Sequence, residues 1–132
     1  MELDDPKNLR RTLYARISRL QLNALLMAFD YPDANVHAEK RAVTTTAMQK
    51  LFAMNSDFMT ERARKVAARL GECGSDEKRV EAAYRMFYLR APDAEERALA
   101  VSFLRKPASS ELSRLEQFAQ SLLMSNEMMY VD

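Results

Sequence analysis

Apolar residues recur every three or four positions through most of this chain, and that spacing predicts a succession of amphipathic helices. The clearest stripe consists of Val80, Ala83, Tyr84, Phe87 and Tyr88. Similar stripes predict further helices over residues 20–30, 46–55, 56–70, 94–105 and 110–126. We therefore expect a mainly α protein, a single-domain bundle of five or six helices.

Residues that commonly cap helices stand at the starts of these segments: Thr46, Ser56, Ser75 or Asp76, Asp93, and Ser109 or Ser110. Asp93 and Glu96 have the spacing of a capping box. Gly71 is expected to end its helix in the left-handed conformation. The almost continuous apolar run after Asp93 indicates that this helix contacts neighbours on several sides.

The sequences of the two ends of the chain suggest extended or irregular structure and not the helices predicted for the rest. Residues 1–8 read as an irregular lead-in, and residues 9–132 read as one helical domain. Apolar and polar side chains alternate over residues 12–18, which favours a strand, with a helix as the alternative. The tail at residues 128–131 is expected to be extended. A small two-stranded β element formed by the N- and C-terminal segments is therefore part of the expectation.

Composition narrows the class of protein without indicating a function. The 132 residues are 48% hydrophobic and 30% charged, which is typical of a folded domain. A net charge of +1 gives no general attraction to nucleic acid or to anionic membranes. The nine methionines are interpreted as core filling. The acidic first residues do not resemble a signal peptide, and no segment has the length of a membrane span, so the localisation stays unknown.

The side chains that usually carry catalysis or bind metals are sparse. His37 is the only histidine and Cys73 the only cysteine. A catalytic triad would have to use His37, which has no nucleophile at a recognisable spacing, and a single cysteine cannot form a cysteine-based metal site. Acidic residues in the loop after residue 30 are too scattered to predict a cation site. We expect no catalytic residue, no metal and no cofactor.

Basic residues gather in two places, which are Arg10, Arg11, Arg16 and Arg19, and then Arg62, Arg64, Lys65 and Arg69. Such clusters can bind phosphates. Helix surfaces are often basic without that role, and Glu61 is placed to pair with Lys65 one turn later. A nucleic-acid partner is therefore the less favoured interpretation.

One polar set stands out around the loop and the short helix after it, namely Asp30, Arg41, Thr44, Thr46, Gln49 and Asn55. In a structural interpretation, Arg41 pairs with Asp30 and a threonine caps the helix. Asn55 then adopts the left-handed conformation that ends the helix. In a functional interpretation, the same six residues form a polar rim for a ligand or a partner domain, and we name them as candidate binding residues.

Several motifs occur in an order that resembles a known family: Arg10-Arg11-Thr12-Leu13-Tyr14, Phe29-Asp30-Tyr31-Pro32-Asp33, the polar set from Arg41 to Asn55, then Tyr84, Phe87, Arg90 and Pro92, and finally the ending from Leu122 to Asp132. They resemble the C-terminal domain of large planctomycetal multidomain proteins, the domain of unknown function 1553 of PSD1 type. A cytochrome c-like domain often accompanies it. Ala47 and Asp57 stand where the family often has proline, and both are compatible with a helix start.

The resemblance implies that the chain is part of a larger extracytoplasmic protein. It implies no reaction, and the chain has no Cys-x-x-Cys-His haem motif. We expect a non-catalytic packing or interaction module that contacts the upstream domains of a parent protein or another protein. Phe103, Leu104, Met128 and Met129 are the residues expected to be exposed for such a contact.

Two alternatives stay open. The chain could be part of a carbohydrate-related enzyme, which needs two carboxyl groups facing each other in a cleft. Asp30 with Asp33, or Glu127 with Asp132, are the pairs that qualify. The other alternative is a small helical domain that binds nucleic acid.

Overall fold

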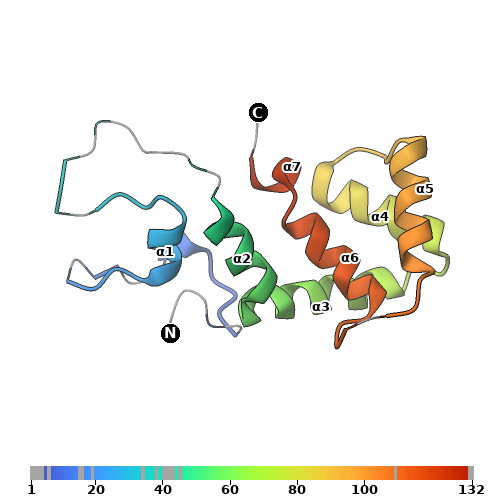
Figure 1. Ribbon diagram of the computed structural model, residues 1–132, viewed down its shortest axis with the longest axis horizontal. Coiled ribbons are helices and arrows are strands. Elements are labelled where there is room, and N and C mark those ends of the chain that lie inside the picture. The colour runs from blue at the N-terminus through green and yellow to red at the C-terminus, as the bar shows by residue number, and fades with distance from the viewer. Residues whose placement is uncertain are drawn as a thin grey trace. The chain divides into compact units, whose positions relative to one another are not determined.

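Figure 1 shows a computed structural model of the chain, which describes residues 5, 7–14, 17–18, 20–33, 35–37, 39, 44, 46–108 and 110–130. Within these residues the fold is all α, with seven α-helices, five of them at least seven residues long, and no strand. The elements in chain order are the 3-10 helix η1 (Thr12–Tyr14), α1 (Ala24–Ala28), α2 (Ala47–Asn55), α3 (Asp57–Gly71), α4 (Asp76–Tyr88), α5 (Ala94–Leu104), α6 (Arg114–Leu123) and α7 (Asn126–Met129). The predicted fold class is confirmed at this level.

The chain divides into two compact units, Met1–Phe58 (unit 1) and Met59–Asp132 (unit 2). This division does not test whether the units fold separately. The single helical domain over residues 9–132, preceded by an irregular lead-in over 1–8, therefore stays a prediction.

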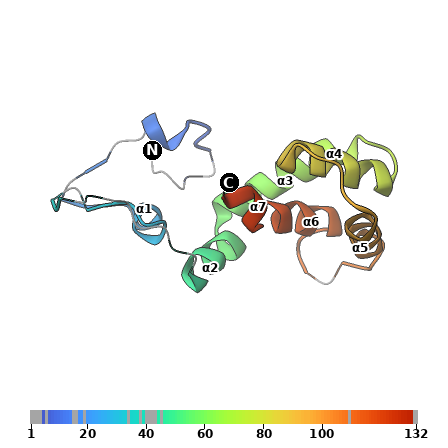
Figure 2. The same ribbon diagram turned by 90° about the horizontal axis from the view of Figure 1, so that it is seen from above.

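The core of unit 2 forms around α4. Val80, Ala83 and Tyr84 on α4 are buried together with residues from α3, α5 and α6, which are Leu70, Ala100, Val101, Phe118 and Leu122. Helix α5 packs against α4 and α6, and α7 packs against the same two helices (Figures 1 and 2). Burial of one apolar stripe from each helix provides the main stabilisation of this unit.

Small side chains set the packing between α3 and α6. Ala63 and Ala67 on α3 are buried with Ala119 on α6, and Val66, Leu115 and Leu123 pack around them. The spacing of Ala63 and Ala67 on α3, four residues apart, is that of a helical face.

Unit 1 buries much less apolar surface. Among its described residues only Leu26 and Ala53 are buried apolar side chains, and Gln49 is buried with them. Phe29 and Phe52 meet edge to face, with ring centroids 5.8 Å apart. Asn23 caps α1 by accepting a hydrogen bond from the backbone N–H of Leu25.

Most of the predicted capping residues are confirmed. Thr46, Ser75 and Asp93 cap α2, α4 and α5, and Ala47 and Asp57 are the first residues of α2 and α3. The last long helix begins later than predicted, because Ser113 caps it and forms a capping box with Glu116. Gly71 lies within α3, so its predicted left-handed ending is wrong. The described glycine with a positive φ is Gly74.

The β element predicted for the two ends is wrong where the structure describes them. Thr12–Tyr14 form a 3-10 helix, and Met128 and Met129 lie in α7. Ser125 caps α7 by accepting from the backbone N–H of Met128 and so turns the tail into a helix. The helix predicted over residues 20–30 is only five residues long, since Asn23 begins it and Asp30 follows it with a positive φ of 56°.

The expected distribution of apolar side chains also needs correction. None of the eight described methionines is fully buried, so they do not fill the core as predicted. Phe103 and Leu104, expected to be exposed, pack against the core, and Met129 is half-buried. Met128 is exposed as expected. Helix α5 contacts both α4 and α6, in line with the expected contacts on several sides, but Leu99 on its outer face is 72% exposed.

Leu89, which ends α4, provides a test of backbone strain. It adopts the left-handed conformation with φ 57° and is 91% exposed, so its side chain contributes almost no packing. That conformation costs an L-residue roughly 1–2 kcal/mol, and the greater unfolded-state entropy of glycine offsets about half of this cost. We predict that Leu89→Gly raises the free energy of unfolding by about 1 kcal/mol, measured by chemical denaturation. Leu89→Ala keeps a Cβ and should gain nothing. A glycine variant less stable than the alanine variant would contradict this account.

Candidate functional site

Within the candidate polar set, hydrogen bonds between Asp30 and Thr44 connect two segments of unit 1 that are distant in the sequence. We call this contact the tie between Asp30 and Thr44. The backbone N–H of Thr44 donates to Oδ2 of Asp30 over 2.7 Å, and its hydroxyl donates to the same carboxylate over 2.8 and 2.9 Å. The two residues are 14 positions apart. An ionised acceptor makes these hydrogen bonds stronger than neutral ones. The carboxylate therefore closes the loop between α1 and α2.

The next two members of the set start α2. The hydroxyl of Thr46 accepts from the backbone N–H of Gln49, and the Gln49 side chain accepts from the backbone N–H of Thr46. This is a complete capping box. Gln49 is 2% exposed, and its side-chain oxygen accepts the hydrogen bond from Thr46 that holds the helix start.

The remaining two members do not join this arrangement. Asn55 is the exposed last residue of α2. It is not among the described residues with a positive φ, so it does not adopt the left-handed conformation predicted for it. Arg41, and with it the predicted Arg41–Asp30 pair, lies outside the described residues. The structure thus brings together Asp30 with Thr44, and Thr46 with Gln49. Both contacts are structural ones, and the role of the set in binding stays a prediction.

The carboxylate pairs that would support an enzyme have other partners. Asp33 accepts hydrogen bonds from the backbone and side-chain nitrogens of Asn35, at 2.9 and 3.1 Å. Glu127 is paired with Arg90, and Asp132 lies outside the described residues. His37 is exposed. Among the described residues, no group of three or more histidine, cysteine, aspartate or glutamate side chains could hold a metal ion.

The basic residues of α3 are partly balanced by acidic neighbours. Glu61 lies 3.9 Å from Arg64 and 4.0 Å from Lys65, and Glu116 lies 4.0 Å from Arg64. Exposed pairs at these distances contribute little to stability. The first basic cluster is described only at Arg10 and Arg11, both of which are exposed.

A second polar cluster, in unit 2, was not recognised as a site from the sequence. Arg90, just after α4, donates to Glu96 over 2.7 and 2.8 Å and to Glu127 over 2.7 and 2.9 Å. Its guanidinium also lies over the rings of Tyr84 and Tyr88, 5.4 and 5.6 Å from their centroids. We call Arg90, Glu96 and Glu127 the Arg90 clasp.

The Arg90 clasp joins α4, α5 and α7. Glu96 also belongs to the capping box of α5, since it accepts from the backbone N–H of Asp93. The hydroxyl of Tyr88 donates to the hydroxyl of Ser125, the cap of α7. Because both carboxylates occupy the planar fork of Arg90, the clasp stabilises the fold and leaves the guanidinium little capacity for an added anion.

Mutual hydrogen bonding shifts the acid–base equilibria of the clasp. Arg90, followed by the backbone N–H of Asp93, lowers the pKa of Glu96 to about 2. Arg90 also lowers the pKa of Glu127, and the two carboxylates raise the pKa of Arg90. Burial raises the pKa of the Tyr84 and Tyr88 hydroxyls. Each group of the clasp is therefore charged at neutral pH.

Comparison with known proteins identifies the family. Residues 2–104 match the PSD1 family, described as a protein of unknown function (DUF1553), and the chain belongs to this family. The matched region includes all of α1 to α5, whereas α6, α7 and Glu127 follow it. No curated protein and no solved structure matches the chain. None of the helices in the described part is long and apolar enough to cross a membrane.

Asp30→Asn tests the tie between Asp30 and Thr44. Asparagine tolerates a positive φ as aspartate does, so the change removes the charge without adding backbone strain. We predict that the Thr44 amide hydrogen exchanges about tenfold faster, because a hydrogen bond to a charged group contributes about 1.5 kcal/mol or more. NMR-detected hydrogen exchange measures this directly. Asp33→Asn, a matched control, should leave Thr44 exchange unchanged, and equal exchange in all three proteins would contradict the tie.

The clasp gives unit 2 a specific pH dependence. Glu96 has a folded-state pKa of about 2. In the unfolded chain its pKa is about 4.3. The unfolded state therefore binds more protons between these values, and the stabilisation present above about pH 4.3 is lost as the pH falls toward 2. We predict that Arg90→Gln loses less stability than the unmodified protein on acidification from about pH 5 to about pH 2.

Denaturation midpoints measured across this pH range test the prediction. Arg85→Gln is the control, because it breaks an exposed pair with Glu81 within α4, at 2.8 Å, and leaves the clasp intact. The control should follow the unmodified protein at every pH. Parallel profiles for Arg90→Gln and the unmodified protein would show that the clasp does not govern acid stability.

Proposed function

We propose that this member of the family is a non-catalytic packing and interaction module from the C-terminal part of a large extracytoplasmic protein of planctomycetal type. Its partner is the upstream part of that parent protein. The origin and size of the parent rest on the order of motifs in the sequence. The interaction role rests on the distribution of apolar side chains in unit 1.

The supporting observation is that unit 1 leaves most of its large apolar side chains uncovered. Fourteen large hydrophobic residues are exposed among the described residues, and ten of them lie in unit 1. Of the thirteen hydrophobic residues that are buried in the described part of the chain, only Leu26 and Ala53 belong to unit 1. Isolated exposed apolar residues are normal, but a unit that exposes so many more than it buries has the surface of an interaction partner.

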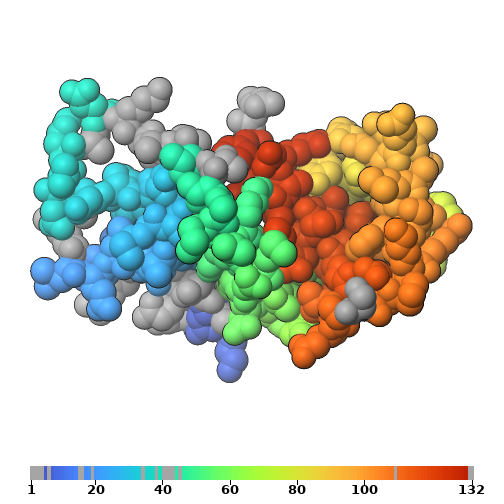
Figure 3. All heavy atoms as spheres, in the orientation of Figure 1, coloured from blue at the N-terminus to red at the C-terminus, as the bar shows by residue number. Residues whose placement is uncertain are grey.

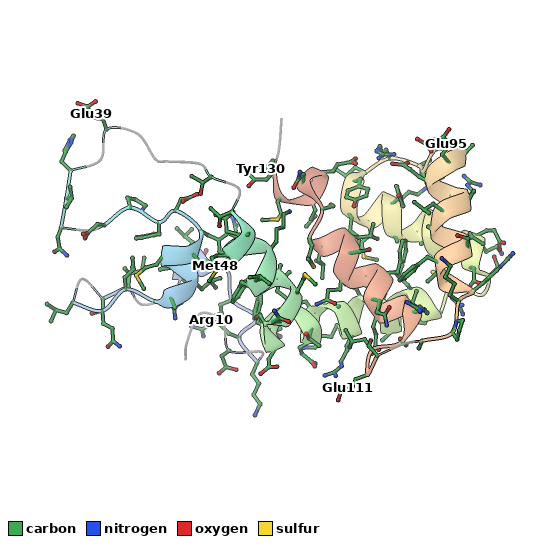
Figure 4. All side chains as sticks on the ribbon, viewed as in Figure 1. Arg10, Glu39, Met48, Glu95, Glu111 and Tyr130 are labelled. Atoms are coloured by element: carbon green, nitrogen blue, oxygen red, sulfur yellow. The ribbon has the colours of Figure 1, made fainter. Side chains whose placement is uncertain are left out.

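Helix α2 presents part of this surface as one face. Ala47, Met48, Leu51 and Met54 are exposed at helical spacing, opposite the buried Gln49 and Ala53. Met48 is 68% and Leu51 50% exposed, and Figure 4 shows the Met48 side chain projecting from α2. Flexible methionine side chains adapt to a partner surface at low cost. We call these four residues the α2 face.

Association with the upstream region of the parent protein tests this function. The full chain and that region, made as separate polypeptides, are expected to associate at micromolar concentration, measured by isothermal titration calorimetry. Leu51→Glu should weaken association at least tenfold, since burying a leucine contributes about 1.5–3 kcal/mol. Met48→Glu, at a more exposed position, should have a similar effect and is less able to disturb the fold.

Leu99→Glu is the matched control, because Leu99 is an exposed leucine on α5 in unit 2. It should bind like the unmodified chain, and circular dichroism should show the same helix content in all variants. No association at high micromolar concentration, or equal loss in Leu51→Glu and Leu99→Glu, would overturn the proposal.

A further inference from the structure

An open groove runs along α5 in unit 2, on the opposite side of the helix from Leu99; it borders the core at Val101, and none of its lining residues belongs to the Arg90 clasp. Its volume is about 510 Å³. It is lined by Ala94, Arg97, Ala98, Val101 and Arg105 of α5 and by Glu77 from the first turn of α4. Helix α5, coloured orange, forms an edge of unit 2 in Figure 3.

The floor of the groove is apolar and shallow. Ala94, Ala98 and Val101 follow one another at intervals of four and three residues, so they form a continuous strip along the helix. Val101 is buried, whereas both alanines are exposed and carry only a methyl group. A strip of this kind allows another helix to approach closely, and its open length suits a chain segment better than an enclosed small molecule.

Two arginines lie at the rim of the groove, and only one of them is paired with acidic side chains in the described part of the chain. At one end, Arg105 donates to Glu77 over 2.9 Å and lies 4.0 Å from Asp76. At the other end, the backbone N–H of Arg97 donates to the Asp93 carbonyl over 3.0 Å, but the exposed guanidinium of Arg97 has no hydrogen bond or ion pair within the described part of the chain. The two arginines are eight residues apart on α5, which is about 12 Å along the helix axis.

We propose that this groove docks an amphipathic helix of a partner protein, with small apolar side chains on the strip and a carboxylate paired with Arg97. The apolar strip contributes burial, and Arg97 selects an acidic partner and its direction along α5. The segment from Ala94 to Arg105 extends for about 16 Å, the length of three helical turns. This surface is separate from the α2 face, so the proposal goes beyond the proposed function.

A synthetic helical peptide serves as the probe. It carries alanine and leucine at positions i, i+4 and i+7 and one glutamate placed to reach Arg97, and the control peptide has lysine in place of that glutamate. Fluorescence anisotropy with the full chain should show saturable binding of the glutamate peptide. Binding of the lysine peptide should be at least tenfold weaker, a difference of about 1.4 kcal/mol.

Charge reversal on the protein locates the contact. Arg97→Glu should weaken binding of the glutamate peptide at least tenfold and restore binding of the lysine peptide. Arg69→Glu makes the same charge change at an exposed position of α3, outside the groove, and should alter neither affinity. Ala98→Phe, which fills the strip, should weaken both peptides, whereas Leu51→Glu on the α2 face should have no effect.

Three outcomes would overturn the proposal. The first is no binding of the glutamate peptide at millimolar concentration. The second is equal weakening by Arg97→Glu and Arg69→Glu, which would show general charge attraction. The third is self-association of the chain in analytical ultracentrifugation that Arg97→Glu abolishes, because the occupant would then be a second copy. Loss of association with the upstream region in Leu51→Glu, with peptide binding retained, would separate this groove from the proposed function.

Discussion

Burial of one apolar face of α4 is the interaction on which unit 2 depends. Val80, Ala83 and Tyr84 supply that face, and the end of α3 together with α5 and α6 covers it. Since α5 contributes Ala100 and Val101 to the same core, its orientation follows from this packing. The groove on α5 borders this core, because Val101 belongs to both, whereas Ala94, Arg97 and Ala98 beside it are exposed. The Arg90 clasp lies at the end of α4, where it joins α5, which the core already holds against α4, and α7, which has no buried residue in that core.

Unit 1 is stabilised by a different balance of forces. Its described residues bury few apolar side chains. The contacts described within it include helix caps, the Phe29–Phe52 ring pair and the tie between Asp30 and Thr44. Polar contacts of this kind fix local geometry but provide less net stability than a packed core. The contrast between this exposed apolar surface and the packed core of unit 2 is the observation behind the proposed interaction role.

Of the contacts described in the candidate site, the sequence predicted only those between residues a few positions apart in the chain. The capping box of Thr46 and Gln49 follows from a spacing of three residues. The tie between Asp30 and Thr44 spans 14 residues and was not predicted; the partner predicted for that carboxylate, Arg41, lies outside the described residues. The Arg90 clasp spans 37 residues between Arg90 and Glu127, and no local signal marks such a pair. Arg90 was noticed in the sequence only as one of the residues shared with a family.

The sequence by itself determined the mainly α class, the positions of α3, α4 and α5, and most caps, because helical periodicity and capping act within a few residues of the chain. The sequence also contained the local caps Ser113 and Ser125, which start α6 and α7, although the prediction placed the start of the last long helix at Ser109 or Ser110 and expected an extended tail. Tertiary structure decided the rest. The methionines stay outside the core, and Arg90 pairs with Glu127 across 37 residues. These outcomes depend on contacts between residues far apart in the chain, which no local pattern encodes.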